Sequence, residues 1–342
     1  RGYIDVDGFD QNSVYIVNAL NNNVKRYWDR LYNTAVIRMK GDPTDPILIK
    51  HFCDPNDTIV ESQQYNASRL DTILINYNND ATLAEGTIFE LEGGKTYYMI
   101  HNVSLSKGLT LRAKKGTGRA KVLMGIETLN GAAKAMNFMF GRNPEPGELG
   151  GINIQSLIFE DIDFDCPAAT NYGDGSATGN YFINMYSGGM AVTMESFEVR
   201  NCTFQRMIRG WIRIQGPNRK TFEKFIVDGC LFYNCGYYDS NGRGYPWIGG
   251  DGNNARSNIY KDMTIQNCTF YDSPRTSFFS DNNKQLAWQD NIRWNIKLLN
   301  NTFVNYSTRS SGRHIFDLRY VPDNSSSTAR KNLFILTKSN SD

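Results

Sequence analysis

Four arginines stand at comparable places in the second half of the chain, each a few residues before or at the start of a short apolar segment. They are Arg209, Arg243, Arg275 and Arg313. A guanidinium group offers its N–H donors in a planar fork that matches a carboxylate or a sulfate. If the segments stack, these side chains form a basic ladder that favours uronic acids or sulfated sugars. A lone arginine in a loop is usually a solvated surface residue, so the hypothesis depends on the repetition.

The same residues suit β-elimination on an acidic sugar. That reaction needs a cation to neutralise the uronate carboxylate and a base near the acidic carbon, and Arg, Lys, His or Tyr can be that base when burial or a second cation lowers its pKa. The candidate catalytic residues are Arg243, Arg275, Arg313 and His314. The candidate substrate-binding residues are Arg209, Trp211, Arg213, Tyr186, Trp247, Asp251, Phe278, Asp281 and Asp317.

Two aspartates among them invite a second interpretation. Asp251 and Asp281 each follow an apolar segment and can form a calcium pair or the acid and base of a hydrolase. Aspartate is also an ordinary turn former in such places. With three histidines in the chain and no paired C-x-x-C spacing, no metal site is predicted, and calcium is the one cofactor left open.

An aromatic column accompanies the arginines. Aligning the second apolar segments places Phe182, Trp211, Trp247, Phe278 and Ile315 in one outward column. Aromatic side chains on strands about 4.8 Å apart make a surface on which pyranose rings can pack. A register slip of one residue would exchange the two faces and put these rings in the core instead. The same alignment puts Asn184, Arg213 and Asp317 in a neighbouring outward column, followed by a column of Tyr186, Gln215, Asp251, Asn282 and Arg319.

These residues must be positioned by an internal repeat. The aligned segments are Phe197–Phe204, Phe225–Phe232, Met263–Phe270 and Ile296–Phe303, with an earlier copy at Leu157–Phe164. The closing phenylalanine of the four later copies recurs after 28, 38 and 33 residues. A period in this range is typical of a solenoid, in which each repeat buries its apolar ridge against its neighbours.

Within each repeat the pattern predicts strand rather than helix. Positions one and three are apolar, and position five is Asp161, Asn201, Gly229, Asn267 or Asn300, residues that accept a left-handed turn. The next inward column holds Cys202, Cys230 and Cys268, which we expect to be free buried thiols. A disulfide among Cys53, Cys166 and Cys235 cannot be assigned from the sequence. The predicted fold is an all-β, single-stranded parallel β-helix.

The ends of the chain differ from the repeat. Residues 1–65 lack it and are expected to form an irregular flank, whereas residues 66–342 form the β-helix domain. Apolar residues at three- and four-residue spacing predict a short helix over residues 67–78 with Asn66 as its N-cap, closing the open end of the solenoid. Residues 332–337 resemble the start of one more repeat.

The opening repeats carry a family resemblance. The segments Glu85–Tyr97 and Val103–Arg112 resemble the first coils of pectin-lyase-like right-handed β-helix proteins, and the likeness covers about residues 65–340. More narrowly, the chain resembles uncharacterised secreted β-helix proteins of polysaccharide-degrading bacteria. The resemblance implies a right-handed β-helix that is secreted, periplasmic or on the outer cell surface, with polysaccharide as partner. Pectate lyases of this superfamily hold calcium on a column of acids, and no such column occurs here.

Composition narrows the function further. Because 37 basic and 35 acidic side chains nearly cancel, and no long basic run occurs, nucleic acid is not an expected partner. No apolar stretch approaches the length of a membrane span. Two function classes remain, a polysaccharide lyase and a non-catalytic glycan-binding protein, with a structural or adhesive role as a third. The sequence leaves open which of them holds, and leaves the oligomeric state open as well.

Overall fold

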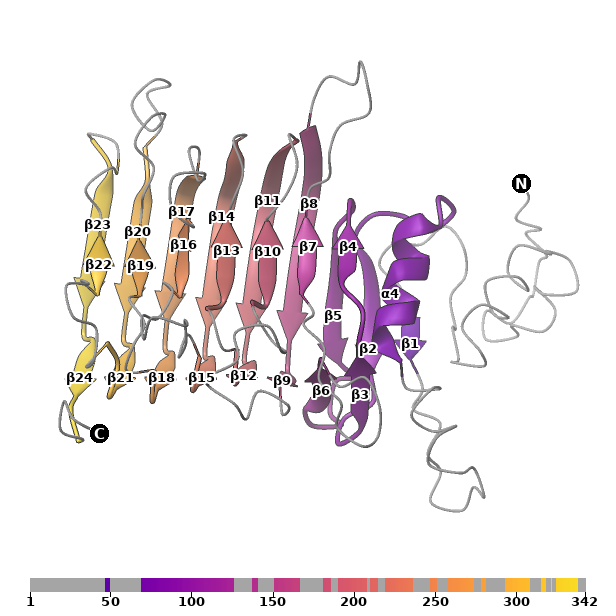
Figure 1. The fold of residues 1–342 in the computed structure, drawn as a ribbon, viewed down its shortest axis with the longest axis horizontal. Helices are drawn as coiled ribbons and strands as arrows, with labels where there is room; N and C mark the ends of the chain where they lie inside the picture. Colours follow the sequence, from indigo (N-terminus) through magenta and orange to yellow (C-terminus); the bar gives the residue numbers. More distant parts are fainter. Residues whose placement is uncertain are drawn as a thin grey trace, which may run out of the picture.

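A computed structural model of the chain describes residues 47–49, 69–125, 137–140, 151–166, 181–185, 190–207, 210–214, 219–235, 247–250, 258–273, 278–280, 293–307, 315–317, 321 and 324–337. Within these ranges the protein is all-β apart from one helix, and its strands form three parallel sheets. In Figure 1 the strands of successive repeats lie side by side along the long axis of the molecule. This arrangement is consistent with the predicted parallel β-helix.

The chain visits the three sheets in turn. Sheet A contains, in spatial order, β1 (Ile47–Ile49), β2 (Thr87–Leu91), β5 (Leu109–Ala113), β8 (Gly151–Glu160), β11 (Ala191–Arg200), β14 (Lys220–Asp228), β17 (Asn258–Gln266), β20 (Asn295–Leu299) and β23 (Ser326–Arg330). Sheet B contains β3 (Thr96–Met99), β6 (Ala120–Met124), β9 (Ile162–Asp165), β12 (Thr203–Gln205), β15 (Leu231–Tyr233), β18 (Thr269–Tyr271), β21 (Thr302–Val304) and β24 (Leu333–Ile335). Sheet C contains β4 (Val103–Leu105), β7 (Phe138–Phe140), β10 (Ile183–Met185), β13 (Ile212–Ile214), β16 (Ile248–Gly250), β19 (Phe279–Ser280) and β22 (Phe316–Asp317).

The predicted ridge is the end of each sheet A strand, the turn after it and the following sheet B strand. The alignment of the repeats is confirmed, because Phe197 pairs in register with Phe225, and Phe225 with Met263. The turn position is left-handed at every predicted residue, with φ of 59° at Asp161, 50° at Asn201, 64° at Gly229, 54° at Asn267 and 56° at Asn300. Asn and Gly tolerate this backbone, so the residue types at the turn fix where each strand ends.

The interior is a set of stacked columns. The closing phenylalanines stack nearly parallel, with ring centroids 5.0 Å apart for Phe204 and Phe232, 4.9 Å for Phe232 and Phe270, and 4.8 Å for Phe270 and Phe303. Beside them Cys202, Cys230 and Cys268 are free thiols buried in the core, as predicted. Cys166 and Cys235 are also free and buried. Cys53 lies outside the described residues.

The helix α4 spans Leu70–Asn79 and packs beside β3 and β4 at the N-terminal end of the sheets (Figure 1). The short amphipathic helix is therefore confirmed, and it buries Leu70, Ile73, Leu74 and Tyr77. Its predicted start is wrong, because the N-cap position is Arg69, which makes no side-chain capping bond. Instead the buried Asp71 carboxylate accepts hydrogen bonds from the backbone amides of Ile100 and His101. Asn66 lies outside the described residues.

The two ends of sheet A extend beyond the aligned repeats. In the flank predicted for residues 1–65, β1 pairs in parallel with β2 and so adds one strand to sheet A. At the other end β23 and β24 pair with β20 and β21, which confirms the further repeat predicted at residues 332–337. No helix in the described ranges is long and apolar enough to cross a membrane.

Candidate functional site

The outer face of sheet C carries the column that the sequence singled out. Asn184 pairs in register with Arg213, Arg213 with Gly249, Gly249 with Ser280, and Ser280 with Asp317. The predicted alignment of Asn184, Arg213 and Asp317 is thus confirmed. Since Ile212 and Ile214 on either side of Arg213 are buried in the core, strand alternation turns Arg213 outward.

The predicted aromatic track on this face is wrong. Trp211 is 0% exposed, and Trp247 and Phe278 are each 1% exposed, so these rings belong to the core and cannot contact a polysaccharide. They stack inside the molecule with Phe182, and the centroids of Trp211 and Trp247 are 4.7 Å apart. Ile315 is only partly buried and packs against the same core.

A bend before the sheet C strands from β10 onward causes the error in the prediction. The backbone amides of Phe182 and Ile183 both donate to the carbonyl oxygen of Trp211, and the amides of Trp211 and Ile212 both donate to that of Trp247. Two consecutive residues therefore point inward at the bend, whereas regular alternation begins only one residue later. The alternative interpretation, in which these aromatics are core, is the correct one.

At Arg213 the outer face holds a cation beside an aromatic ring. The guanidinium carbon of Arg213 lies 5.4 Å from the centroid of the Tyr181 ring, a distance typical of a cation–π contact. Tyr181 is held by its neighbour, since its backbone amide donates to Asn137 Oδ1 over 3.0 Å. The backbone amide of Asn137 donates in turn to Asn102 Oδ1 over 2.8 Å. This chain of amide groups holds the backbone that carries the ring beside Arg213.

Asn184 adds a buried acceptor next to this cation. The residue is 6% exposed although it lies on the outward column, and its Oδ1 atom has no hydrogen-bond partner. Most buried polar atoms are paired, so an unpaired one calls for a partner such as an ordered water or a ligand group. On the other side of Arg213 the column continues with Gly249, which has no side chain to compete for space. Asn184 and Arg213 are register partners on neighbouring strands, so a carbonyl acceptor and a guanidinium donor belong to one column.

The other predicted site residues lie outside the described residues. They are Tyr186, Arg209, Arg243, Asp251, Arg275, Asp281, Arg313 and His314. The backbone of Asp317 is described at its place in the column, but its side chain is not. The arginine ladder, the lyase machinery and the carboxylate pair therefore stay predictions. Among the residues that the structure does describe, no group of three or more His, Cys, Asp or Glu side chains is placed to hold a metal ion.

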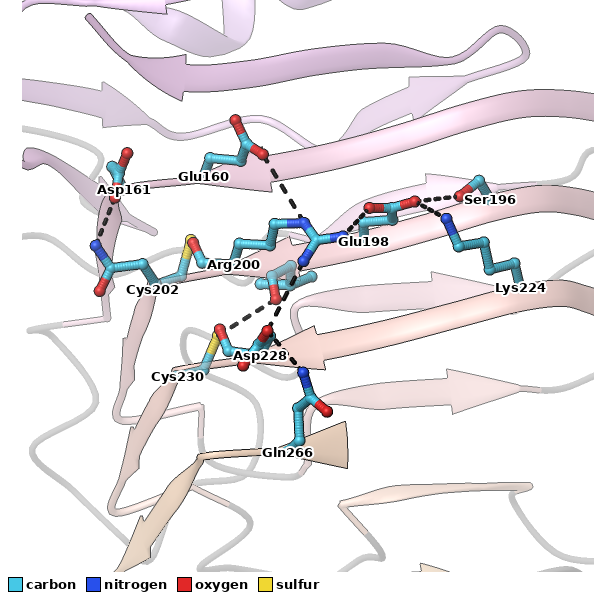
Figure 2. A network of polar contacts seen from close by, with 12 residues as sticks. Glu160, Asp161, Ser196, Glu198, Arg200, Cys202, Lys224, Asp228, Cys230 and Gln266 are labelled. Atoms are coloured by element: carbon cyan, nitrogen blue, oxygen red, sulfur yellow. Dashed lines mark hydrogen bonds and ion pairs between the residues drawn. The ribbon is translucent and has the colours of Figure 1, made fainter. Parts of the chain in front are cut away.

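The outer face of sheet A carries a network that sequence reasoning missed. Figure 2 shows Glu198 at its centre, where it accepts hydrogen bonds from Lys224 over 2.6 Å and from Arg200 over 2.6 Å. Arg200 also approaches Glu160 and Asp228 on the neighbouring strands, at 4.0 Å and 3.8 Å. The sequence indicates which charged residues of the predicted strands face outward. It does not indicate which of these long side chains form ion pairs, because that depends on their conformations.

This network is electrostatically satisfied. Burial alone would raise the pKa of Glu198, but hydrogen bonds from Lys224, Arg200 and Ser196 outweigh it and lower the pKa to about 2. Nearer the N-terminal end, Arg112 pairs with Glu90 over 2.8 Å on the same face. Acids and bases that neutralise one another across strands hold the sheet together and leave little charge for a ligand.

Comparisons with models of protein families, with curated proteins and with solved structures found no match for this chain.

Proposed function

We propose that the chain is a right-handed parallel β-helix, secreted or held at the cell surface, that binds an acidic polysaccharide along the outer face of sheet C. The observation that carries the proposal is the pair formed by Arg213 and the buried Asn184 carbonyl. A uronic acid offers both a carboxylate, which accepts from the guanidinium group, and hydroxyl groups, which donate to the amide oxygen.

The repeat suits a polymer. Neighbouring strands lie about 4.8 Å apart, so one column presents a new side chain to the ligand at each repeat. The segments that lead into the sheet C strands contain the four arginines of the predicted ladder, Arg209, Arg243, Arg275 and Arg313. Their positions in the chain support a basic surface continuing from Arg213, which would hold several acidic units at once. The combined affinity of repeated weak contacts grows with each one.

The first test is affinity electrophoresis in gels containing polygalacturonate, alginate or chondroitin sulfate. We expect the wild-type protein to be retarded by an acidic polymer, and Arg213→Ala to weaken the interaction by about 10- to 100-fold because a charge-assisted hydrogen bond is lost. Lys224→Ala is the matched control, since it removes one exposed positive charge from sheet A. Equal retardation of wild type and Arg213→Ala in every acidic gel would contradict the proposal.

The same polymers distinguish binding from chemistry. Incubation with and without calcium, followed by absorbance of unsaturated uronates, reports β-elimination directly. Product would make the protein a polysaccharide lyase, and single alanine substitutions at Arg243, Arg275, Arg313 and His314 would then locate the base. Retardation without product favours a non-catalytic binding protein. If neither retardation nor product is observed, a structural or adhesive role for the repeat is favoured.

A further inference from the structure

Sheet B presents an outer surface of a different kind. Two outward columns run along it, since Leu231 pairs in register with Thr269 and Tyr233 with Tyr271, and the next strand continues both columns with Thr302 and Val304. Leu231 and Tyr271 are each 37% exposed and Tyr233 is 36% exposed, whereas the phenylalanine between the columns is buried on every one of these strands. We call these six residues of β15, β18 and β21 the sheet B strip.

Charge is lost along this face. On β9 the two columns hold Asp163, which pairs with Arg119 over 2.8 Å, and Asp165, which pairs with Arg206 over 2.6 Å, and on β12 they hold the uncharged Thr203 and Gln205. From β15 to β21 neither outward column contains a side chain that is charged at neutral pH, and the residues are leucine, threonine, tyrosine and valine. An acidic glycan or a nucleic acid would find no cation on the strip. Because the strip offers no charge to pair with a charged ligand, it suits an uncharged partner.

The two tyrosines of the strip determine which groups a partner can contact. The rings of Tyr233 and Tyr271 stack with their centroids 5.3 Å apart and their planes 15° from parallel. The stacked faces of the two rings cover each other, so a partner contacts the ring edges and the hydroxyl groups. The edge of an aromatic ring carries partial positive charge, which suits an oxygen-rich neutral ligand. Thr269 and Thr302 add methyl and hydroxyl groups in the parallel column.

Polar turns border the strip on both sides. Before the strip Asn300 Nδ2 donates to Asn267 Oδ1 over 3.2 Å, and after it Asn305 Nδ2 donates to Asp272 Oδ1 over 3.0 Å. All four residues have a left-handed backbone, with φ between 49° and 56°. The surface is thus a ribbon of two adjacent outward columns, mostly apolar or aromatic, with hydrogen-bonding turns at its rims. A chain of pyranose rings has the same pattern, with apolar C–H faces and hydroxyl edges.

We infer that the sheet B strip binds a neutral polysaccharide, at a surface separate from the acidic-glycan site on sheet C. The strip lies on a different sheet from Arg213 and Asn184 and shares no residue with them. A protein with both surfaces would hold two kinds of glycan together.

The test is affinity electrophoresis in gels containing hydroxyethyl cellulose, a soluble neutral β-glucan, or galactomannan. We expect the wild type to be retarded and the double variant Tyr233→Ala/Tyr271→Ala to lose about tenfold in affinity, because both central contacts are removed. Tyr98→Ala is the matched control, since it removes a tyrosine from the outer face of the same sheet near the N-terminal end. Circular dichroism melts identify any variant that fails to fold, and Tyr233→Phe/Tyr271→Phe, which keeps the rings, then serves instead with a smaller expected loss.

Three outcomes would overturn the inference. In the first, the wild type is not retarded by either neutral polymer. In the second, the double variant is retarded as strongly as the wild type. In the third, sedimentation shows a dimer that the double variant abolishes, which would mean that the strip pairs two copies of the chain. Arg213→Ala is expected to run as wild type in the neutral gels. Failure of the sheet B proposal would therefore appear only in the neutral gels, and failure of the sheet C proposal only in the acidic gels.

Discussion

The outer faces of sheets A and C are made by the same repeats and differ in how their polar groups are used. On sheet A, Glu198 is bonded by Lys224, Arg200 and Ser196, so the network in Figure 2 is closed on itself. On sheet C, Asn184 is buried with an unpaired oxygen beside the cation of Arg213. A repeat can therefore use one face for cohesion and keep another for a ligand.

Strand length explains part of this difference. The sheet A strands β8 and β11 are each 10 residues long, and their outward positions give long side chains partners on both neighbouring strands. The sheet C strands β10 and β13 are each 3 residues long, so each offers a single outward residue between two inward ones. Few cross-strand partners are available there, and the oxygen of Asn184 has none.

The largest expected effect separates the two sides of sheet C. Trp247→Ala removes a ring stacked between Trp211 and Phe278 in the core, and we expect it to lower the free energy of unfolding by about 3–5 kcal/mol. Arg213→Ala, on the outer side of the neighbouring strand, should change it by less than about 1 kcal/mol. Urea unfolding followed by circular dichroism measures both. Wild-type stability of Trp247→Ala would mean that the ring faces solvent after all.

A smaller effect tests whether the sheet A network is structural. Glu198→Gln removes the charge that Lys224 and Arg200 share, and we expect a loss of about 1–2 kcal/mol because hydrogen bonds to charged groups are lost. Glycan retardation should not change. If Glu198→Gln abolished glycan binding at wild-type stability, the roles assigned to the two faces would be exchanged.

The same residue predicts a pH dependence. The pKa of Glu198 is lowered from 4.5 to about 2 in the folded protein, so its contribution is complete above pH 4.5 and is lost as the pH falls through about 2. Between these values the unfolded chain binds more protons at this site than the folded one. The stability of the wild type should therefore fall more steeply on acidification than that of Glu198→Gln.

The repeat could be predicted because two simple sequence patterns specify it. Alternation over the ridge shows which side chains of each strand are inward, and Asn or Gly at the turn position shows where the strand ends, as at Asn267 and Gly229. Both patterns are local, and each is repeated in successive copies. The sheet A and sheet B register followed from them.

The faces of sheet C could only be predicted in part. Trp211 and Arg213 are two residues apart, so simple alternation puts both on the same side and predicts that both lie outside. The bend at Trp211 breaks that alternation, which leaves Arg213 outside and Trp211 in the core. A strand of 3 residues is too short for its own pattern to reveal such a bend. The buried oxygen of Asn184 depends on packing and has no sequence signal.

The smallest effect concerns a single ion pair on sheet A. Lys261 Nζ lies 2.6 Å from Glu223 Oε2, and both side chains are more than a third exposed, at 41% and 36%. A double-mutant cycle with Glu223→Ala and Lys261→Ala should give a coupling of about 0.2–1 kcal/mol that declines in high salt. Glu198 is bonded by three side chains and is less exposed than Glu223. Substituting Glu198 should therefore lower the free energy of unfolding by more than the coupling energy of the Glu223–Lys261 pair. A coupling for Glu223 and Lys261 as large as the Glu198→Gln effect would show that isolated pairs, rather than the closed network, hold the outer face of sheet A.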